Sequence, residues 1–124
     1  MIVGLGLDVV ELDRIERVLS RFGDRFLRRI LTEQEKARVP KFPTAFIAAR
    51  FAAKEAASKA LGTGFRQGVG FHTLEVRKLP SGKPEMVFLG PARALCEKMG
   101  VTSTHLSMTH GRDVASAVVV LEAL

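Results

Sequence analysis

The chain of 124 residues contains no tryptophan, no tyrosine and only one cysteine, Cys96. A single cysteine excludes an internal disulfide and a zinc site built from several cysteines, and it suits a reducing cytoplasm. Every aromatic residue is a phenylalanine, and there are only 8 of them. Few rings are therefore available for stacking on bases, so nucleic acid is disfavoured as a partner.

Long apolar runs are also absent. None approaches the ~20 residues that a membrane-spanning helix needs. The opening segment MIVGLGLDVV lacks the basic residues and the cleavage site of a secretion signal. We therefore expect a cytoplasmic protein with no membrane segment. The length fits one compact domain, residues 1–124, with a core of its own.

Positive charge is in excess. The 19 Lys and Arg residues against 13 Asp and Glu residues give a formal net charge of +6. Such an excess favours an anionic partner, which leaves phosphorylated small molecules, acidic proteins and nucleic acid as candidates.

Hydrophobic periodicity and the positions of Gly and Pro predict an α+β domain. Alanine is the best helix former, so the alanine-rich segment 44–61 is expected to form a long helix with Gly62 as its cap. Thr32 and Glu35 have the spacing of a capping box, which predicts a short helix ended by Pro40 and Pro43. Further helices are predicted at 10–22 and 91–99, and strands at 1–10, 72–79, 84–89, 105–110 and 114–121. Because the later strands follow one another in pairs, we expect a largely antiparallel sheet.

The last predicted strand, VASAVVVLEAL, is apolar on both faces. A strand in so small a protein then needs cover on both sides of its sheet. Either another protomer or a helix of the same chain can supply the second cover.

Two glycine-rich stretches resemble phosphate-binding loops. Gly4-Leu5-Gly6 lacks the third glycine of a dinucleotide fingerprint, so Rossmann-type binding is disfavoured. Gly62-Thr63-Gly64 follows its helix, where the negative end of the dipole repels phosphate. Neither stretch is a nucleotide-binding loop of a known type.

The long helix carries Glu55 and Lys59 four residues apart, on one face. In isolation such a pair is best interpreted as a surface ion pair. Its neighbours are small or apolar, and a partly shielded pair is costly unless it is used. Asp8, near the end of the first strand, is either a cap for the next helix or a metal ligand. Asp8 and Glu55 together are the smallest set of protein ligands for Mg²⁺. This ion retains several water ligands and takes phosphate oxygens of a substrate as the others.

Three histidines are candidates for a functional role. His105 and His110 lie five residues apart on one predicted strand, so their side chains face opposite ways. If one histidine is functional, His110 at the strand end is favoured. His72 is expected on the surface of its strand.

Arginine recurs every three or four residues near the N-terminus. A helix that continued past Gly23 would align these residues in one stripe. We interpret the stripe as a docking surface for an acidic partner. It consists of Arg14, Arg17, Arg21, Arg25 and Arg28.

Taken together, these residues resemble the holo-[acyl-carrier-protein] synthase family, the small phosphopantetheinyl transferases of bacterial fatty acid synthesis. The resemblance covers nearly the whole chain, through the segments GLGLDVVELDRIERV, RILTEQE, RFAAKEAASKALGTG, SGKP and HLSMTHGRDVASAVVV. It implies a Mg²⁺-dependent transfer of 4'-phosphopantetheine from coenzyme A to a serine of apo acyl carrier protein, with release of adenosine 3',5'-bisphosphate. It also implies a homotrimer with coenzyme A in clefts between protomers, which would account for the doubly apolar last strand.

The resemblance implies a role for each of the residues above. Asp8 and Glu55 would hold Mg²⁺, and Glu55 would also help to deprotonate the serine. Lys59 would neutralise charge on the transferred phosphoryl group, and His110 would hydrogen-bond near the phosphates. The coenzyme A site would be lined by Arg50, Gly62 and Gly64, by His110 with Thr109 beside it, and by Ser81, Gly82, Lys83 and Pro84 of the neighbouring chain. The carrier protein would be engaged by Arg14, Arg21, Arg25 and Arg29.

Two positions depart from the family pattern. Larger relatives carry a second acidic residue two positions after the first metal ligand, where this chain has Val10, so water would fill that coordination. Many members have Asp or Glu directly after the last histidine, where this chain has Gly111, with Asp113 two residues further on. Two other classes remain as alternatives: a basic module that grips RNA or an acidic protein without catalysis, and an oligomeric scaffold.

Overall fold

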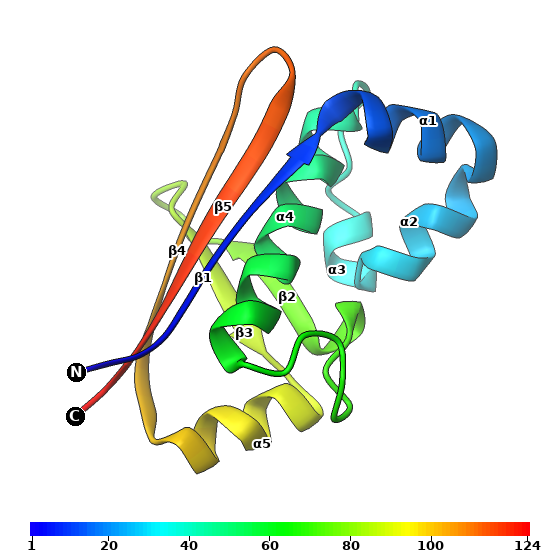
Figure 1. The fold of residues 1–124 in the computed structure, drawn as a ribbon. Helices are drawn as coiled ribbons and strands as arrows, with labels where there is room; N and C mark the ends of the chain where they lie inside the picture. The colour runs from blue at the N-terminus through cyan, green and yellow to red at the C-terminus, as the bar shows by residue number, and fades with distance from the viewer.

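The computed structural model describes residues 1–124 and has the α+β architecture that the sequence predicts (Figure 1). No helix has the length and hydropathy needed to cross a membrane. The elements, in chain order, are β1 (Ile2–Glu11), α1 (Leu12–Phe22), α2 (Asp24–Ile30), α3 (Glu33–Lys36), α4 (Thr44–Leu61), the 3-10 turn η1 (Phe71–Thr73), β2 (Leu74–Lys78), β3 (Pro84–Phe88), α5 (Gly90–Met99), β4 (Val101–His110) and β5 (Val114–Ala123).

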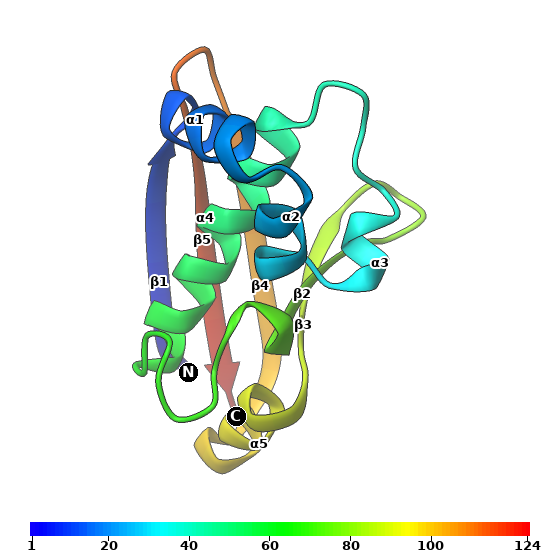
Figure 2. The same cartoon turned by 90° about the vertical axis from the view of Figure 1, so that its right-hand side faces the viewer.

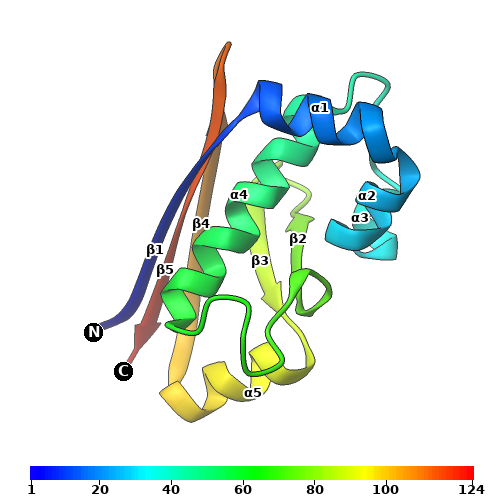
Figure 3. The same ribbon diagram turned by 45° about the vertical axis from the view of Figure 1, so that its right-hand side comes forward.

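The strands form two antiparallel sheets. β1, β5 and β4 make a three-stranded sheet in that order, and β2 and β3 make a separate hairpin. In Figure 2, α4 crosses in front of the three-stranded sheet. Figure 3 shows the hairpin, α2 and α3 on the opposite side of α4. α4 is therefore the centre of the core, and its residues face two sets of neighbours.

α4 spans the residues predicted from the sequence. Gly62 ends it in the left-handed conformation, with φ of 80°. The small alanine side chains let β1 approach closely: a Cβ on Gly6 would overlap the carbonyl oxygen of Ala56, and one on Gly4 would overlap that of Ala60. Gly4 and Gly6 do not form a nucleotide-binding loop. They are required because β1 touches α4 at these two positions.

The N-terminal helices differ from the prediction. β1 runs on to Glu11, and α1 begins at Leu12 rather than at residue 10. Gly23 has a φ of 54°, a value that other residues rarely adopt, and a separate helix, α2, follows it. The arginines therefore do not lie along one continuous helix.

The β2–β3 hairpin also differs in detail. β2 begins at Leu74, and His72 lies in η1, where its Nε2 is 2.7 Å from the carbonyl oxygen of Arg28. His72 is exposed, as predicted, but its predicted place on a strand is wrong. Glu75 is only 3% exposed, because both faces of the first half of β2 are covered.

β5 is covered on one face by a helix of its own chain. Its inward residues are buried where α4 packs on the sheet: Ala115, Ala117, Val119 and Leu121. On the outer face, Leu5, Leu7 and Val9 of β1 are 64%, 61% and 58% exposed. They pair with residues of β5 that face the same way. The single chain leaves this outer face apolar and uncovered.

Candidate active site

Asp8 reaches toward α4 from the inner face of β1, between the outward-facing Leu7 and Val9. The Lys59 amine donates to Asp8 Oδ1 at 3.1 Å and to the carbonyl oxygen of Leu7 at 3.0 Å. Asp8 is not a helix cap, because the residue that precedes α1 is Glu11. The close contact between β1 and α4 thus brings a carboxylate and an amine together from distant parts of the sequence.

Glu55 adds a second carboxylate from α4. Burial raises the pKa of Glu55, and the negative charge of Asp8 raises it further, whereas Lys59 and Arg14 act in the opposite direction. Lys59 pairs with Asp8 and not with Glu55, so the surface ion pair within the helix does not form. We call Asp8, Glu55 and Lys59 the acid–lysine cluster.

The acid–lysine cluster offers oxygen ligands to a metal ion, but only two carboxylates. No group of three or more His, Cys, Asp or Glu side chains that could hold a metal occurs in the structure. Mg²⁺ is commonly bound through one or two carboxylates, with water and substrate phosphates as its other ligands. Burial raises the pKa of Glu55, and the nearby charge of Asp8 raises it further, so the two carboxylates lie close enough to share such an ion.

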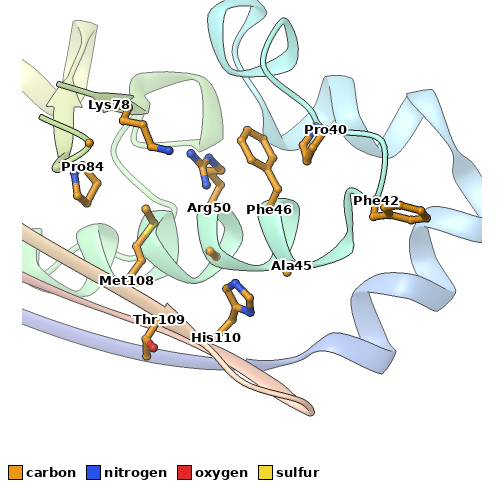
Figure 4. Close-up of a pocket in the computed structure, with 12 residues that line it drawn as sticks. Pro40, Phe42, Ala45, Phe46, Arg50, Lys78, Pro84, Met108, Thr109 and His110 are labelled. Carbon is orange, nitrogen blue, oxygen red and sulfur yellow. The ribbon is translucent and has the colours of Figure 1, made fainter. Parts of the chain in front are cut away.

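A second group of candidate residues lines a pocket of about 480 Å³ between α4, the β2–β3 hairpin and the end of β4 (Figure 4). Arg50 comes from α4, and Gly82 and Pro84 come from the hairpin. Thr109 and His110 come from β4. We call this the hairpin pocket.

The two histidines of β4 face opposite ways, as their spacing predicts. His110 lines the hairpin pocket. His105 is on the outer face and pairs with Glu122, and this hydrogen bond lowers the pKa of Glu122. Only His110 therefore lies among the other candidate residues.

Sequence reasoning missed several side chains of the hairpin pocket, among them Phe46 and Lys78. The Arg50 guanidinium lies 3.6 Å from the centre of the Phe46 ring, and its Nε is buried without a hydrogen-bond partner. Burial lowers the pKa of Arg50, although arginine remains charged. A half-buried cation with an unused donor, in a pocket that also holds Lys78, suits an anionic ligand. Phe46 lies four residues before Arg50 on the predicted helix, so helical spacing alone could have placed the two side chains on one face.

Within one chain, the hairpin pocket and the acid–lysine cluster are separate. The pocket that holds Arg50 and His110 does not include Asp8, Glu55 or Lys59. Arg50 and Glu55 are five residues apart on α4, which places their side chains roughly 140° apart around the helix axis.

The remaining expected ligands of coenzyme A lie outside the hairpin pocket. Gly62 and Gly64 follow the end of α4 with φ of 80° and 58°. Ser81 and Lys83 are exposed in the hairpin turn, where the Lys83 backbone N–H donates to Ser81 Oγ at 3.4 Å. Arg50 shares its pocket with Gly82 and Pro84 of the hairpin in its own chain.

The N-terminal arginines gather around apolar side chains in spite of the break at Gly23. They form a pocket of about 320 Å³, lined by Arg14, Val18, Phe22, Arg25, Phe26 and Arg29. The Arg21 guanidinium lies 5.2 Å from the centre of the Phe22 ring. Arg17 and Arg28 instead pair with acidic residues on their own helices. We call the result, an apolar floor ringed by cations, the arginine pocket.

Comparisons with known proteins identify the family and the fold of this chain. The model of the 4'-phosphopantetheinyl transferase superfamily matches residues 4–119. The chain is 62% identical over 122 residues to the holo-[acyl-carrier-protein] synthase of Solidesulfovibrio magneticus, which covers 98% of this chain and 99% of the relative. The crystal structure of the holo-[acyl-carrier-protein] synthase from Neisseria meningitidis has a TM-score of 0.90 at 42% identity, covering 98% of this chain and 99% of that one. The synthase from Bacillus anthracis in complex with CoA (3',5'-ADP) has a TM-score of 0.82 at 42% identity, covering 100% and 99%.

Proposed function

The chain belongs to the 4'-phosphopantetheinyl transferase superfamily, as a member of its holo-[acyl-carrier-protein] synthase family, and from this premise we propose that it transfers 4'-phosphopantetheine from coenzyme A to a serine of apo acyl carrier protein. The other product is adenosine 3',5'-bisphosphate. The observation that carries the proposal is the acid–lysine cluster, in which the Lys59 amine is bonded to Asp8 beside the carboxylate of Glu55.

The reaction is a phosphoryl transfer. The serine oxygen attacks the phosphorus that bears the pantetheine group. The bond from that phosphorus to the bridging oxygen of the diphosphate breaks, and the bridging oxygen leaves with the adenosine bisphosphate. Glu55 accepts the serine proton. Lys59 stabilises the negative charge that develops on the transferred group.

Mg²⁺ would be held by Asp8 and Glu55, with water and diphosphate oxygens as its other ligands. When bound, it supplies positive charge that stabilises the diphosphate and its leaving group. The chain prepares the site, because Lys59 fixes the orientation of Asp8 through its 3.1 Å hydrogen bond.

The adenosine bisphosphate half of coenzyme A would bind in the hairpin pocket. Arg50 and Lys78 supply positive charge for its phosphates, and His110 supplies a hydrogen bond. Phe46, stacked on Arg50, supplies apolar contact. Thr109, Gly82 and Pro84 shape the remaining wall, with Ser81 and Lys83 at its edge.

Because the hairpin pocket and the acid–lysine cluster are separate in one chain, we propose that they meet across a protomer boundary. Gly62 and Gly64 would then belong with the acid–lysine cluster of one chain, and Arg50 with the hairpin of its neighbour. The uncovered apolar face of β1 and β5 supports assembly into a homotrimer. Each trimer would contain three composite sites.

The arginine pocket would bind the carrier protein. An acidic helix can place carboxylates on Arg14, Arg21, Arg25 and Arg29, and an apolar side chain on the floor between them. Binding of an acidic helix would also explain why the arginines lie together beside apolar side chains.

The deciding experiment incubates the protein with coenzyme A and an apo carrier protein, with Mg²⁺ or with EDTA, and measures the mass of the carrier. We expect a gain of one phosphopantetheine group with Mg²⁺ only. Glu55→Gln should slow the transfer by about 10²-fold or more, because a general base and a ligand are lost. An unmodified carrier under all conditions would refute the proposal. If the alternative of a basic RNA-binding module were correct, RNA affinity would fall steeply with salt and be the same in Glu55→Gln.

The homotrimer has its own test. Leu7→Lys places a charge on the outer face of β1, where the wild-type side chain is exposed in the single chain. We expect sedimentation to show a trimer for the wild type and a monomer for Leu7→Lys, with loss of transfer activity. An active monomer would contradict the composite site while leaving the reaction in place.

A further inference from the structure

Lys54, the first residue of the KEAASK segment, belongs to neither group of candidate site residues. Its side chain is fully buried. All three donors of its amine are used: to Glu35 Oε1 at 2.6 Å, to the Ile30 carbonyl oxygen at 2.7 Å and to the Phe71 carbonyl oxygen at 2.8 Å. One side chain of α4 is thereby bonded to α2, α3 and η1.

Glu35 extends these bonds to a fourth neighbour. Its Oε1 also accepts from the Thr32 N–H at 2.9 Å, and its Oε2 accepts from the Val76 N–H of β2 at 2.7 Å. Both carboxylate oxygens are used, and the residue is 2% exposed. We call the Lys54–Glu35 pair with these bonds the buried hub.

The buried hub joins the parts of the chain that carry the proposed binding features. α2 ends at Ile30 and carries Arg25 and Arg29 of the arginine pocket. α4 carries Glu55 next to Lys54. On its other side, Glu35 lines a cavity of about 500 Å³ whose walls include Arg50 and Lys78 of the hairpin pocket.

Stability alone does not explain such a hub. Replacing a buried ion pair with apolar residues often leaves a protein equally stable, so burial of charge is weak support for a purely stabilising role. Unlike apolar packing, the hydrogen bonds of the buried hub are directional. Each one fixes the position of a specific atom on a different helix or strand. α2 packs mainly on α1, α3 and η1 rather than on α4, so the bond from Lys54 to Ile30 links α2 directly to the helix that carries Glu55.

We propose that Lys54 and Glu35 are positioning residues that hold the carrier-binding helix α2 at a fixed distance from the reacting groups on α4. The inference rests on the proposed function, because it gives the arginine pocket its role. Without the hub the serine of a docked carrier would arrive misplaced, whereas coenzyme A would still find the hairpin pocket formed by α4, β4 and the hairpin.

The test compares Lys54→Met with Lys36→Met. Both changes remove an amine that pairs with a carboxylate, but the Lys36 side chain is 28% exposed and its pair with Asp24 lies on the surface. For Lys54→Met we expect kcat/KM for the carrier to fall by about tenfold or more, since small misplacements of a reacting group have effects of this size. The KM for coenzyme A should change by less than about twofold, and Lys36→Met should leave both parameters within about twofold.

The split between the two substrates decides the outcome. The proposal is wrong if folded Lys54→Met has the same kcat/KM for the carrier as Lys36→Met. It is also wrong if the rates with both substrates fall only in proportion to the folded fraction measured by circular dichroism, because the pair is then merely structural. An equal loss of kcat/KM for coenzyme A and for the carrier also overturns the proposal, because the change would then not be confined to the position of α2.

A second variant covers the case in which Lys54→Met does not fold. The double variant Glu35→Gln with Lys54→Met leaves no unpaired buried charge but still lacks the bonds to Ile30 and Phe71, so it should show the same selective loss. Amide hydrogen exchange over residues 24–30 gives a readout that needs no activity, and it should be faster in the double variant than in Lys36→Met. If wild-type protein transfers nothing, the proposed function fails while faster exchange still supports the hub; unchanged exchange refutes the hub alone.

Discussion

The two lysines of KEAASK lie five residues apart on one helix, and they differ in almost every physical respect. Lys54 has no exposed side-chain surface and uses all its donors on protein atoms. The Lys59 side chain is 52% exposed and shares its amine between Asp8 and a backbone oxygen. Lys54 faces α2, α3 and η1, whereas Lys59 faces β1. A segment that reads as one motif is therefore two sites on different sides of α4.

The contrast between Lys54 and Lys59 shows that the degree of burial determines what a lysine amine can do. A fully buried amine must have its donors satisfied, so Lys54 is committed to the positions of its partners. An amine at the surface can exchange its partner for a substrate phosphate at low cost, so Lys59 is free to act on a ligand. The sequence presents both as lysines beside alanines, and only the packing around α4 separates them.

The largest expected effect on stability is at Lys54. Lys54→Met leaves Glu35 as an unpaired buried carboxylate, which should lower the free energy of unfolding by about 3–5 kcal/mol. Urea unfolding measures it. The double variant Glu35→Gln with Lys54→Met should recover part of this loss, and a loss in Lys54→Met no larger than in Lys36→Met would contradict the contrast between buried and exposed lysines.

Gly6→Ala should disrupt the contact between β1 and α4 on the side that carries Lys59, and it should leave the buried hub intact. The added methyl group would overlap the Ala56 carbonyl oxygen, so β1 must move away from α4. We expect a loss of about 1–3 kcal/mol of stability and a severe loss of activity, because Asp8 moves with β1. Gly70→Ala is the matched control, since a Cβ there meets nothing within 4 Å. Thermal unfolding and the carrier assay read both effects, and an active, stable Gly6→Ala would show that the close contact is dispensable.

Lys59→Met should reverse the pattern of Lys54→Met. Removing a half-exposed amine should change the free energy of unfolding by less than about 1 kcal/mol. The rate of transfer should fall by about 10²-fold or more, because charge on the phosphoryl group is no longer neutralised. Unfolding and kcat are measured on the same preparation. If Lys59→Met lost stability and kept its rate, the roles of the two lysines would have to be exchanged.

Local signals predicted the fold where one segment determines its own structure. α4 has the predicted ends because alanine favours helix throughout and Gly62 can adopt a positive φ. The capping box of Thr32 and Glu35 is also confirmed. The sequence does not determine whether the helix breaks at Gly23, because a glycine within a helical pattern can either be tolerated or form a turn, and tertiary packing decides between them.

The site could be predicted less well, because its residues meet only through packing. The proximity of Asp8 and Glu55 depends on Gly4 and Gly6, whose role as contact residues has no local signature. The sequence pattern predicts only the capping-box role of Glu35, yet its carboxylate also accepts from Lys54 and from the N–H of Val76. A local motif cannot show that a residue has a second, distant partner.

The smallest expected effect belongs to the exposed pair of Lys36 and Asp24, which contrasts with both lysines of α4. The hydrogen bond from Lys36 lowers the pKa of Asp24 from its ordinary value of 3.8, and Arg28 adds to this. A carboxylate whose pKa is lower in the folded state contributes stability above the unfolded pKa and loses it as pH falls through the folded pKa. The difference in unfolding midpoint between wild type and Asp24→Asn should therefore be small and constant near neutral pH, should begin to shrink as pH approaches 3.8, and should vanish only below the lowered pKa of the folded state. It should also shrink at high salt, because exposed charges are screened. A difference that persists at low pH would mean that Asp24 acts through packing rather than charge.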